Sequence, residues 1–227
     1  MPQPFPAHKL QPYLEQIRQA NPSQQAIAFY PNNWNIPILD THFQTLLRTI
    51  PQLTSGCITR QWVEQIGNFA SQNLIPWDGF FLAVMIWGYG TVGYGPWRTQ
   101  QMFQTANFAN IFASIRNQIQ NNNVKEAYNL ALIDRCGPPF FTKLFYFLGR
   151  VFNSQPLPVI LDSRVAASLL KCNGNDFNGV AYFKQKAATR FSLGYMEYVS
   201  DVNLWGQANN FSPDQLEIFL FSPPVDF

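Results

Sequence analysis

Breaks rich in asparagine, proline and glycine divide this 227-residue chain into short segments, each long enough for one helix. Stretches such as 31–33 (Pro-Asn-Asn) and 121–123 (Asn-Asn-Asn) favour loops. Between the breaks apolar residues recur at helical spacing, and neither strand alternation nor an internal repeat is evident. The pattern predicts a mostly α fold with two lobes and an active-site cleft between them. The expected helices are 9–20, 41–50, 59–71, 78–87, 99–118, 124–135, 143–152, 163–171, 180–207 with a break at Gly194, and 213–221.

Composition favours a single globular domain over residues 1–227. With 47% hydrophobic and 12% charged residues, the chain resembles neither a disordered protein nor a coiled coil. The longest unbroken apolar run, residues 80–87, is too short to cross a membrane. Residues 1–6 lack the charged and apolar parts of a signal peptide. We therefore expect a cytoplasmic monomer, associated with the nucleoid if the source is bacterial.

Lys143 and Asp162 are predicted to share a pocket although nineteen residues separate them. A helix over 143–152 advances about 15 Å, at 1.5 Å per residue. The stretch through Pro156 and Pro158 is expected to be extended, and at about 3.3 Å per residue it can cover the same distance on its return. An amine and a carboxylate would then meet near the start of the helix.

The expected surroundings of Lys143 favour a reactive amine. The lysine would lie in the first turn of a helix, where the helix dipole disfavours a cation, and among phenylalanines. Both influences favour the neutral amine, which is the nucleophilic form. The alternatives are an exposed lysine whose stem covers the phenylalanines and an Asp162 that caps the helix following it. Capping is compatible with catalysis.

Residues 132–170 resemble the helix-hairpin-helix DNA glycosylases, in particular the 8-oxoguanine (OGG-type) branch. In that branch the hairpin ends in Thr-Lys, and a Pro-Val stretch leads to an Asp at the head of the next helix. Thr142-Lys143 and Asp162 occupy these places without a gap, within a hairpin and catalytic segment at about 124–171. The resemblance implies a bifunctional DNA glycosylase and AP lyase with Lys143 as nucleophile and Asp162 as an ionised partner. It also implies duplex DNA containing a modified base, by default 8-oxoguanine.

The hairpin departs from the family pattern. The family usually has Leu-Pro-Gly-hydrophobic-Gly before Thr-Lys, whereas this chain has Gly-Pro-Pro-Phe-Phe at 137–141. Proline offers no N–H to a phosphate. We therefore expect Gly137 to make the tight turn and free N–H groups at the helix start to replace the missing donor. The residues expected to contact DNA are Gly137, Phe140, Phe141, Thr142, Arg98 and Arg164.

The sequence predicts no metal or cofactor. Three dispersed cysteines, Cys57, Cys136 and Cys172, do not suggest a disulfide framework. They also cannot build the four-cysteine iron–sulfur loop that some members of the superfamily carry. The two histidines, His8 and His42, lack the spacing of metal ligands.

Positive charge is concentrated in the second half of the chain. Residues 143–190 contain seven basic and two acidic side chains, a balance of +5, whereas the remainder contains eight basic and eleven acidic side chains, or −3. Such a basic region is typical of phosphate contacts, although ordinary solvated charges give the same count. The seven basic residues are Lys143, Arg150, Arg164, Lys171, Lys184, Lys186 and Arg190.

A glycine motif at 88–93 matches the dinucleotide-binding pattern G-x-G-x-x-G. We reject that function because Gly95-Pro96 follows in place of a helix and no acid lies about twenty residues further on. The run 87–99 is instead expected to form a tight loop before the next helix. Arg98 would clamp a phosphate there, and nearby aromatic residues would stack on bases or pack.

Three alternatives remain open at this stage. The enzyme acts on another modified base, including one found in phage DNA; the chain is a non-catalytic helical DNA-binding module; or it is an unrelated helical hydrolase. A hydrolase lacks support because no Ser–His–acid or metal constellation is present. Burial of Lys143 would distinguish the enzyme from the binding module.

Overall fold

The computed structural model describes residues 5–172 and 192–224 and is built mainly of helices, which confirms the predicted helical class. No helix in these ranges is long and apolar enough to cross a membrane. Four short 3-10 turns and one pair of strands complete the described elements. The helices are α1 (Ala7–Leu10), α2 (Leu14–Gln19), α3 (Pro37–Thr49), α4 (Arg60–Ser71), α5 (Trp77–Tyr89), α6 (Gly95–Phe103), α7 (Phe108–Gln120), α8 (Val124–Leu130), α9 (Pro138–Phe152), α10 (Ser163–Cys172), α12 (Ser192–Asn209) and α13 (Pro213–Phe221).

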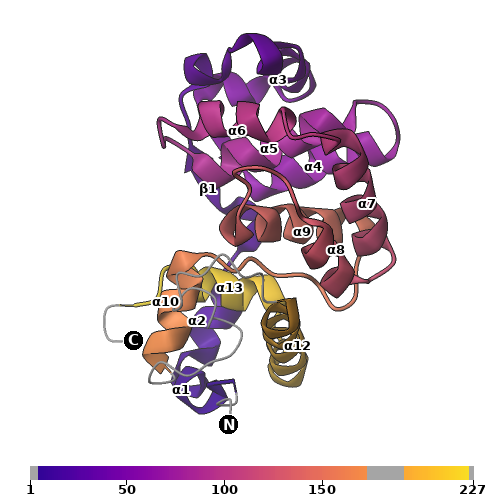
Figure 1. The fold of residues 1–227 in the computed structure, drawn as a ribbon. Coiled ribbons are helices and arrows are strands. Elements are labelled where there is room, and N and C mark those ends of the chain that lie inside the picture. Colours follow the sequence, from indigo (N-terminus) through magenta and orange to yellow (C-terminus); the bar gives the residue numbers. More distant parts are fainter. Residues whose placement is uncertain (1–4, 173–191, 225–227) are drawn as a thin grey trace.

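The helices lie in two groups. Figure 1 shows α3 to α9 in the upper group and α1, α2, α10, α12 and α13 in the lower group. The first and last helices therefore belong to the same group, and residues 153–162 lead from α9 down to α10. The ends of several helices agree with the sequence. Thr59 caps α4 by accepting the N–H of Trp62 at 3.1 Å, and α13 runs over 213–221 as predicted.

Other helix boundaries were wrong, and local residues explain them. The expected helix 9–20 is interrupted by a 3-10 turn containing Pro12, and 99–118 is two helices because Asn107 adopts a left-handed conformation with φ 59°. Helix α8 ends at Leu130, before the predicted end at 135. Helix α9 begins five residues before Lys143 because two prolines fit its first turn. The start of the predicted helix 180–207 lies outside the described residues, and α12 continues through Gly194 without a break.

A small antiparallel sheet was not predicted. Strand β1 (Ala26–Ala28) pairs with β2 (Cys57–Thr59), with Ala26 opposite Thr59. The pairing extends by one step, since the N–H of Arg60 donates to the carbonyl of Gln25 at 3.1 Å. Three-residue strands carry too little alternation to be recognised in a sequence, yet these two bring Gln25 beside Arg60.

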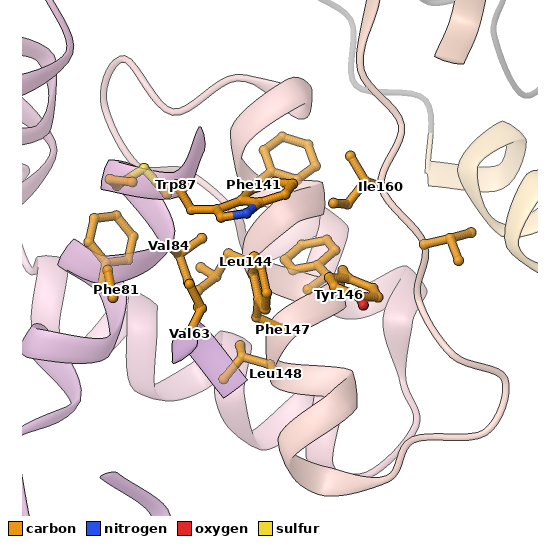
Figure 2. Packing of buried hydrophobic residues seen from close by; sticks show 14 of the residues in the cluster. Val63, Phe81, Val84, Trp87, Phe141, Leu144, Tyr146, Phe147, Leu148 and Ile160 are labelled. Carbon is orange, nitrogen blue, oxygen red and sulfur yellow. The ribbon is translucent and has the colours of Figure 1, made fainter. Parts of the chain in front are cut away.

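The core centres on α5 and α9. Figure 2 shows Val84 and Trp87 of α5 directed toward Leu144 and Phe147 of α9, with Ile160 of the extended segment nearby. The rings of Trp87 and Phe147 meet edge to face, with centroids 5.3 Å apart. Both helices are buried on nearly every side, since residues 79–87 of α5 and 141–149 of α9 are buried without interruption. The start of α9 is consequently held by a large apolar contact.

Buried side chains hold the extended segment between α9 and α10 by its backbone. Asn203 accepts the N–H of Leu157 at 3.0 Å and donates to the carbonyl of the same residue at 2.9 Å. The next contacts come from two tyrosines of α12 and one threonine of α9. They are Tyr195 Oη to Val159 O (2.8 Å), Tyr198 Oη to Ile160 O (3.0 Å) and Leu161 N to Thr142 Oγ1 (3.2 Å). The segment therefore approaches α9 in a defined register that ends at Asp162.

Candidate active site

Lys143 and Asp162 form a direct ion pair. The distance from Lys143 Nζ to Asp162 Oδ2 is 3.2 Å, and the two side chains are 9% and 11% exposed. This confirms the prediction that the chain runs out along a helix and returns to bring amine and carboxylate together. We refer to these two residues, for which the sequence predicts a catalytic role, as the catalytic pair.

The two carboxylate oxygens of Asp162 have different hydrogen-bond partners. Oδ1 accepts the backbone N–H groups of Arg164 and Val165, at 3.0 and 3.2 Å, and so caps α10. Oδ2 is left for the amine of Lys143. Capping fixes the plane of the carboxylate. As predicted, the same side chain can cap α10 and still face the amine of Lys143.

The amine of Lys143 is held from a position that differs from the prediction. Because α9 begins at Pro138, Lys143 lies in its second turn, and its side chain points back toward the helix start. Nζ donates to the carbonyl of Pro139 at 2.8 Å. The stem also lies along the ring of Phe140, whose centroid is 5.8 Å from Nζ. The expected first-turn dipole effect is therefore replaced by a specific hydrogen bond and apolar packing.

The catalytic pair opens into a pocket of about 560 Å³, within the usual range for ligand sites. A hollow of similar size, about 590 Å³, lies beside α12, but no ionisable side chain lines it. The pocket of the catalytic pair offers more chemistry. Its lining includes Gln25, residues 26–28 of β1, residues 87–92, Lys143, residues 162–164 and Phe221.

The glycine run that matches a dinucleotide motif forms part of this pocket. Gly88 packs against the lysine, because a Cβ added there would lie 3.2 Å from Lys143 Cδ. Gly90 has a φ of +55°, and a Cβ there would lie 2.8 Å from Ile27. Gly88 therefore allows close packing against Lys143 and Gly90 against Ile27, and neither position leads into a Rossmann helix.

The hairpin before α9 differs from expectation in two respects. Gly137 is extended (φ −75°, ψ 175°), and the left-handed residue of the turn is Arg135, with φ 60°. The N–H groups of Phe140 and Phe141 are not free, since both donate to the carbonyl of Gly137, at 2.8 and 3.1 Å. Because α9 begins at Pro138, these two N–H groups form hydrogen bonds in its own first turn.

The side chains expected at DNA fall into exposed and buried sets. Phe141 and Thr142 are buried, and Thr142 instead bonds the extended segment. Arg164 is exposed, lines the pocket and lies over the ring of Phe221 at 4.8 Å. Arg98 lies in the first turn of α6, because the predicted loop over 87–99 ends at Gly95.

Two arginines lie over two exposed aromatic rings at and just before the start of α6. Arg98 lies 4.5 Å from the ring centroid of Tyr94, and Arg135 lies 5.7 Å from that of Trp97. The two rings are 54% and 51% exposed. Arg150, in contrast, is paired with Glu64 at 3.1 Å. Three of the predicted basic residues, Lys184, Lys186 and Arg190, lie outside the described residues.

Sequence reasoning missed the wall formed by Gln25 and Trp87 and the charges behind it. Arg60 and Glu217 are buried at 0% and 1% exposure, and their side chains meet at 2.6 Å. Burial raises the pKa of Glu217 above its ordinary value, and Arg60 partly opposes that rise. One signal was present in the sequence, since Glu217 interrupts an otherwise apolar run from 216 to 221.

Comparison with known families identifies one match. The family model described as "Putative 8-oxoguanine DNA glycosylase OGG-like protein" matches residues 20–221. Searches of curated proteins and of solved structures each gave no match. In the described residues no group of three or more His, Cys, Asp or Glu side chains is placed to hold a metal ion.

Proposed function

Since the chain belongs to the OGG-like DNA glycosylase family, we propose that it flips a modified base out of duplex DNA and excises it through a lysine Schiff base. The observation that carries the proposal is the ion pair of Lys143 and Asp162 inside a pocket. A base inside a duplex cannot be reached by protein side chains, so the target nucleotide must leave the stack.

Lys143 is placed to act as the nucleophile. In its neutral form the amine has two N–H donors, and Pro139 O and Asp162 Oδ2 accept both. The lone pair then has the remaining direction, toward the pocket that Lys143 lines. Attack on the sugar C1′ forms the N–C1′ bond and breaks the bond between C1′ and the base, which leaves with its electron pair and takes up a proton.

The covalent intermediate accounts for strand cleavage. Opening of the sugar ring gives a protonated Schiff base between Nζ and C1′. Loss of a proton from C2′ then expels the 3′ phosphate by β-elimination. No outside oxidant or reductant is needed. Asp162, oriented by the start of α10, stabilises positive charge that develops on the sugar.

The surface beside the pocket suits a phosphate backbone. Arg98 and Arg135, with the exposed rings of Tyr94 and Trp97, provide cations and stacking surfaces around the start of α6. Arg164 adds a cation at the pocket itself. Gly137 and Phe140 are proposed to contribute contacts through the hairpin surface, while Phe141 and Thr142 support it from inside. The family suggests 8-oxoguanine as the first substrate to test.

Burial of the lysine favours an enzyme over a binding module. Lys143 as a whole is 7% exposed, and its stem is enclosed by Gly88 and Phe140. A module that only grips phosphates gains nothing from a cation withdrawn from its surface. The catalytic proposal explains both the burial and the paired carboxylate.

Borohydride trapping tests the proposal. The protein is incubated with a panel of duplexes, each holding one modified base, and with a duplex holding an abasic site. Borohydride reduces a Schiff base to a stable amine, so a covalent protein–DNA adduct is expected with the correct substrate. Lys143→Gln is expected to abolish trapping while leaving DNA binding largely intact.

Lys9→Gln is the matched control, because Lys9 is exposed on α1 and absent from the pocket lining. It should trap as well as the wild type. Undiminished trapping by Lys143→Gln would overturn the assignment of the nucleophile. Base release by the wild type without any trappable adduct would indicate a water nucleophile and contradict the lyase chemistry.

A further inference from the structure

A second hollow with a charged lining lies at the other end of α5 from the catalytic pair. Its volume is about 300 Å³, and residues of α4, α5, α7 and α9 form it, all in the upper group of helices (Figure 1). Trp77 lines this hollow and Trp87 lines the catalytic pocket, so about 15 Å of helix separates the two, at 1.5 Å per residue. Among the described residues that line the hollow, Arg116 alone is charged, and we call the hollow the Arg116 site.

The guanidinium of Arg116 packs on aromatic rings but has no polar partner. It lies 4.4 Å from the ring centroid of Trp77 and 5.2 Å from that of Phe112. In the part of the chain that the structure describes, Arg116 forms neither an ion pair nor a hydrogen bond, whereas Arg60 and Arg150 each pair with a glutamate. The cation–π contacts explain the position of the guanidinium, but they leave its donors without an acceptor.

Two neighbouring features do not supply that acceptor. Asp78 follows Trp77 in the chain, but its Oδ2 lies 3.9 Å from His42 Nε2, and it is not paired with Arg116. Helix α9 ends at the site, but its carbonyls are occupied, since Ser154 donates its backbone N–H to Gly149 O at 2.9 Å. The end of α4 is closed in the same way. The positive charge of Arg116 is therefore not explained by its surroundings.

Two amides of α7 add donors beside Arg116. Asn117 and Gln120 line the same hollow. The Oδ1 of Asn117 accepts from Asn121 at 3.3 Å, which leaves the NH₂ group of Asn117 free to donate elsewhere. The amide of Gln120 is exposed and forms no hydrogen bond within the described ranges. The site thus combines one cation with two amides, and none of its described lining residues is acidic.

This combination suits an anion with several oxygens. The Nε of Arg116 is buried, so contacts with a ligand fall to the two Nη groups, which form a parallel pair of donors. A phosphate group can accept from both and still has oxygens left for the amides. We propose that Arg116, Asn117 and Gln120 bind a phosphate group at a site separate from the catalytic pocket. The phosphate belongs either to the backbone of bound DNA or to a free phosphate compound.

Titration with inorganic phosphate tests the site. The side-chain signals of Arg116 and the amide signals of Asn117 and Gln120 are followed by NMR, with sodium chloride holding the ionic strength constant. We expect saturable shifts with a Kd of about 1–10 mM, as for a few charge-assisted hydrogen bonds open to water. Shifts that do not saturate, or that leave these three residues unchanged, would overturn the proposal.

Variants of the site should lose this binding. Arg116→Gln should raise the Kd for phosphate by about tenfold or more, because it removes hydrogen bonds from a charged donor. Gln120→Glu keeps the arginine on its rings but places a negative charge beside the anion, and it should also raise the Kd by about tenfold. Arg48→Gln is the matched control, since Arg48 is exposed on α3 and absent from the lining.

Thermal melting shows whether each variant is folded. If Arg116→Gln does not fold, Gln120→Glu decides, because Gln120 is exposed and makes no contact that folding requires. The same Kd in wild type and Gln120→Glu would contradict the proposal. An equal loss of binding in Arg48→Gln would indicate a general effect of charge and contradict it as well.

An unmodified duplex distinguishes the two sources of phosphate. Its affinity is measured by fluorescence anisotropy over a range of salt concentrations. If the DNA backbone occupies the site, Arg116→Gln should weaken binding and reduce the salt slope by about one. Unchanged affinity and slope, together with lost binding of inorganic phosphate, would assign the site to a free phosphate compound. Neither measurement depends on base excision, so a failure of borohydride trapping would refute the proposed function and leave this inference standing.

Discussion

The catalytic pair and the wall of Gln25 and Trp87 line the same pocket, but different kinds of contact hold them in place. Lys143 bonds a carbonyl in its own helix, and Asp162 caps the helix that follows it. This wall contacts Arg60, whose side chain pairs with that of Glu217, 157 residues later in the sequence. Short-range contacts therefore orient the two side chains of the catalytic pair, whereas a long-range buried contact supports the wall.

Breaking the long-range contact is expected to have the largest effect. Arg60→Met leaves Glu217 as a buried charge without its partner, which should lower the free energy of unfolding by about 3–5 kcal/mol. Urea denaturation measures the loss. Arg48→Met is the control, because Arg48 is exposed on α3 and its Nε donates only to a carbonyl of its own helix, so the variant should lose about 0.5 kcal/mol or less. Equal losses in the two variants would contradict the difference between the regions.

Asp162→Asn should separate chemistry from folding. The amide oxygen can still cap α10, but the charge facing Lys143 is lost, so base release should fall by about 10²–10³-fold. The melting temperature should stay close to that of the wild type. Asp134→Asn, at an exposed carboxylate in the turn before α9, should change neither quantity. Full activity in Asp162→Asn would remove the carboxylate from the mechanism.

Thr142→Val tests how the approach of Asp162 is maintained. Valine has a similar shape but leaves the buried N–H of Leu161 without its acceptor, which should cost about 1–3 kcal/mol. Thr99→Val provides the comparison, since the hydroxyl of Thr99 bonds only a carbonyl within its own helix. We expect Thr142→Val to be less stable by denaturation and slower in trapping, and Thr99→Val to trap normally. Slower trapping in both variants would argue against a specific role.

Alkaline pH should weaken the support of the extended segment. Burial raises the pKa of Tyr195 and of Tyr198 well above 10.0, whereas the same phenols in the unfolded chain ionise near that value. The unfolded state thus loses protons first, and stability falls as pH rises above about 10. Tyr198→Phe should lower stability at pH 7 by about 0.5–1.5 kcal/mol and flatten this decline. Denaturation curves at pH 7 and at pH 10 to 11 would reveal an unchanged slope if the expectation is wrong.

The sequence was informative where local residues determine the structure. The final helix over 213–221 and the return of Asp162 to Lys143 follow from neighbouring residues or from chain geometry. The start of α9 was misplaced because two prolines look like a break, although proline is well tolerated in a first turn. The proximity of Lys143 to Asp162, which depends on these elements, could therefore be predicted from the sequence.

The wall of Gln25 and Trp87 could not be predicted because its contacts are tertiary. Strands β1 and β2 are three residues each, and their pairing places Gln25 beside Arg60. Nothing in either segment alone indicates that an arginine would be withdrawn from water to meet Glu217. The break between α6 and α7 at the left-handed Asn107 was not predicted either, because the apolar pattern continues across it.

Residues 157–161 are held by hydrogen bonds to their backbone, and this fixes the position of the residue that follows them, Asp162. The peptide groups of this segment form hydrogen bonds with the side chains of Asn203, Tyr195, Tyr198 and Thr142. The length of the segment, and not its side chains, therefore determines the position of Asp162. Removing one residue would move the carboxylate by about 3.3 Å along the chain and turn it to the opposite side. Exchanging one apolar side chain for another there leaves every one of these bonds available. We therefore expect this segment to tolerate exchanges between apolar residues but not insertions or deletions.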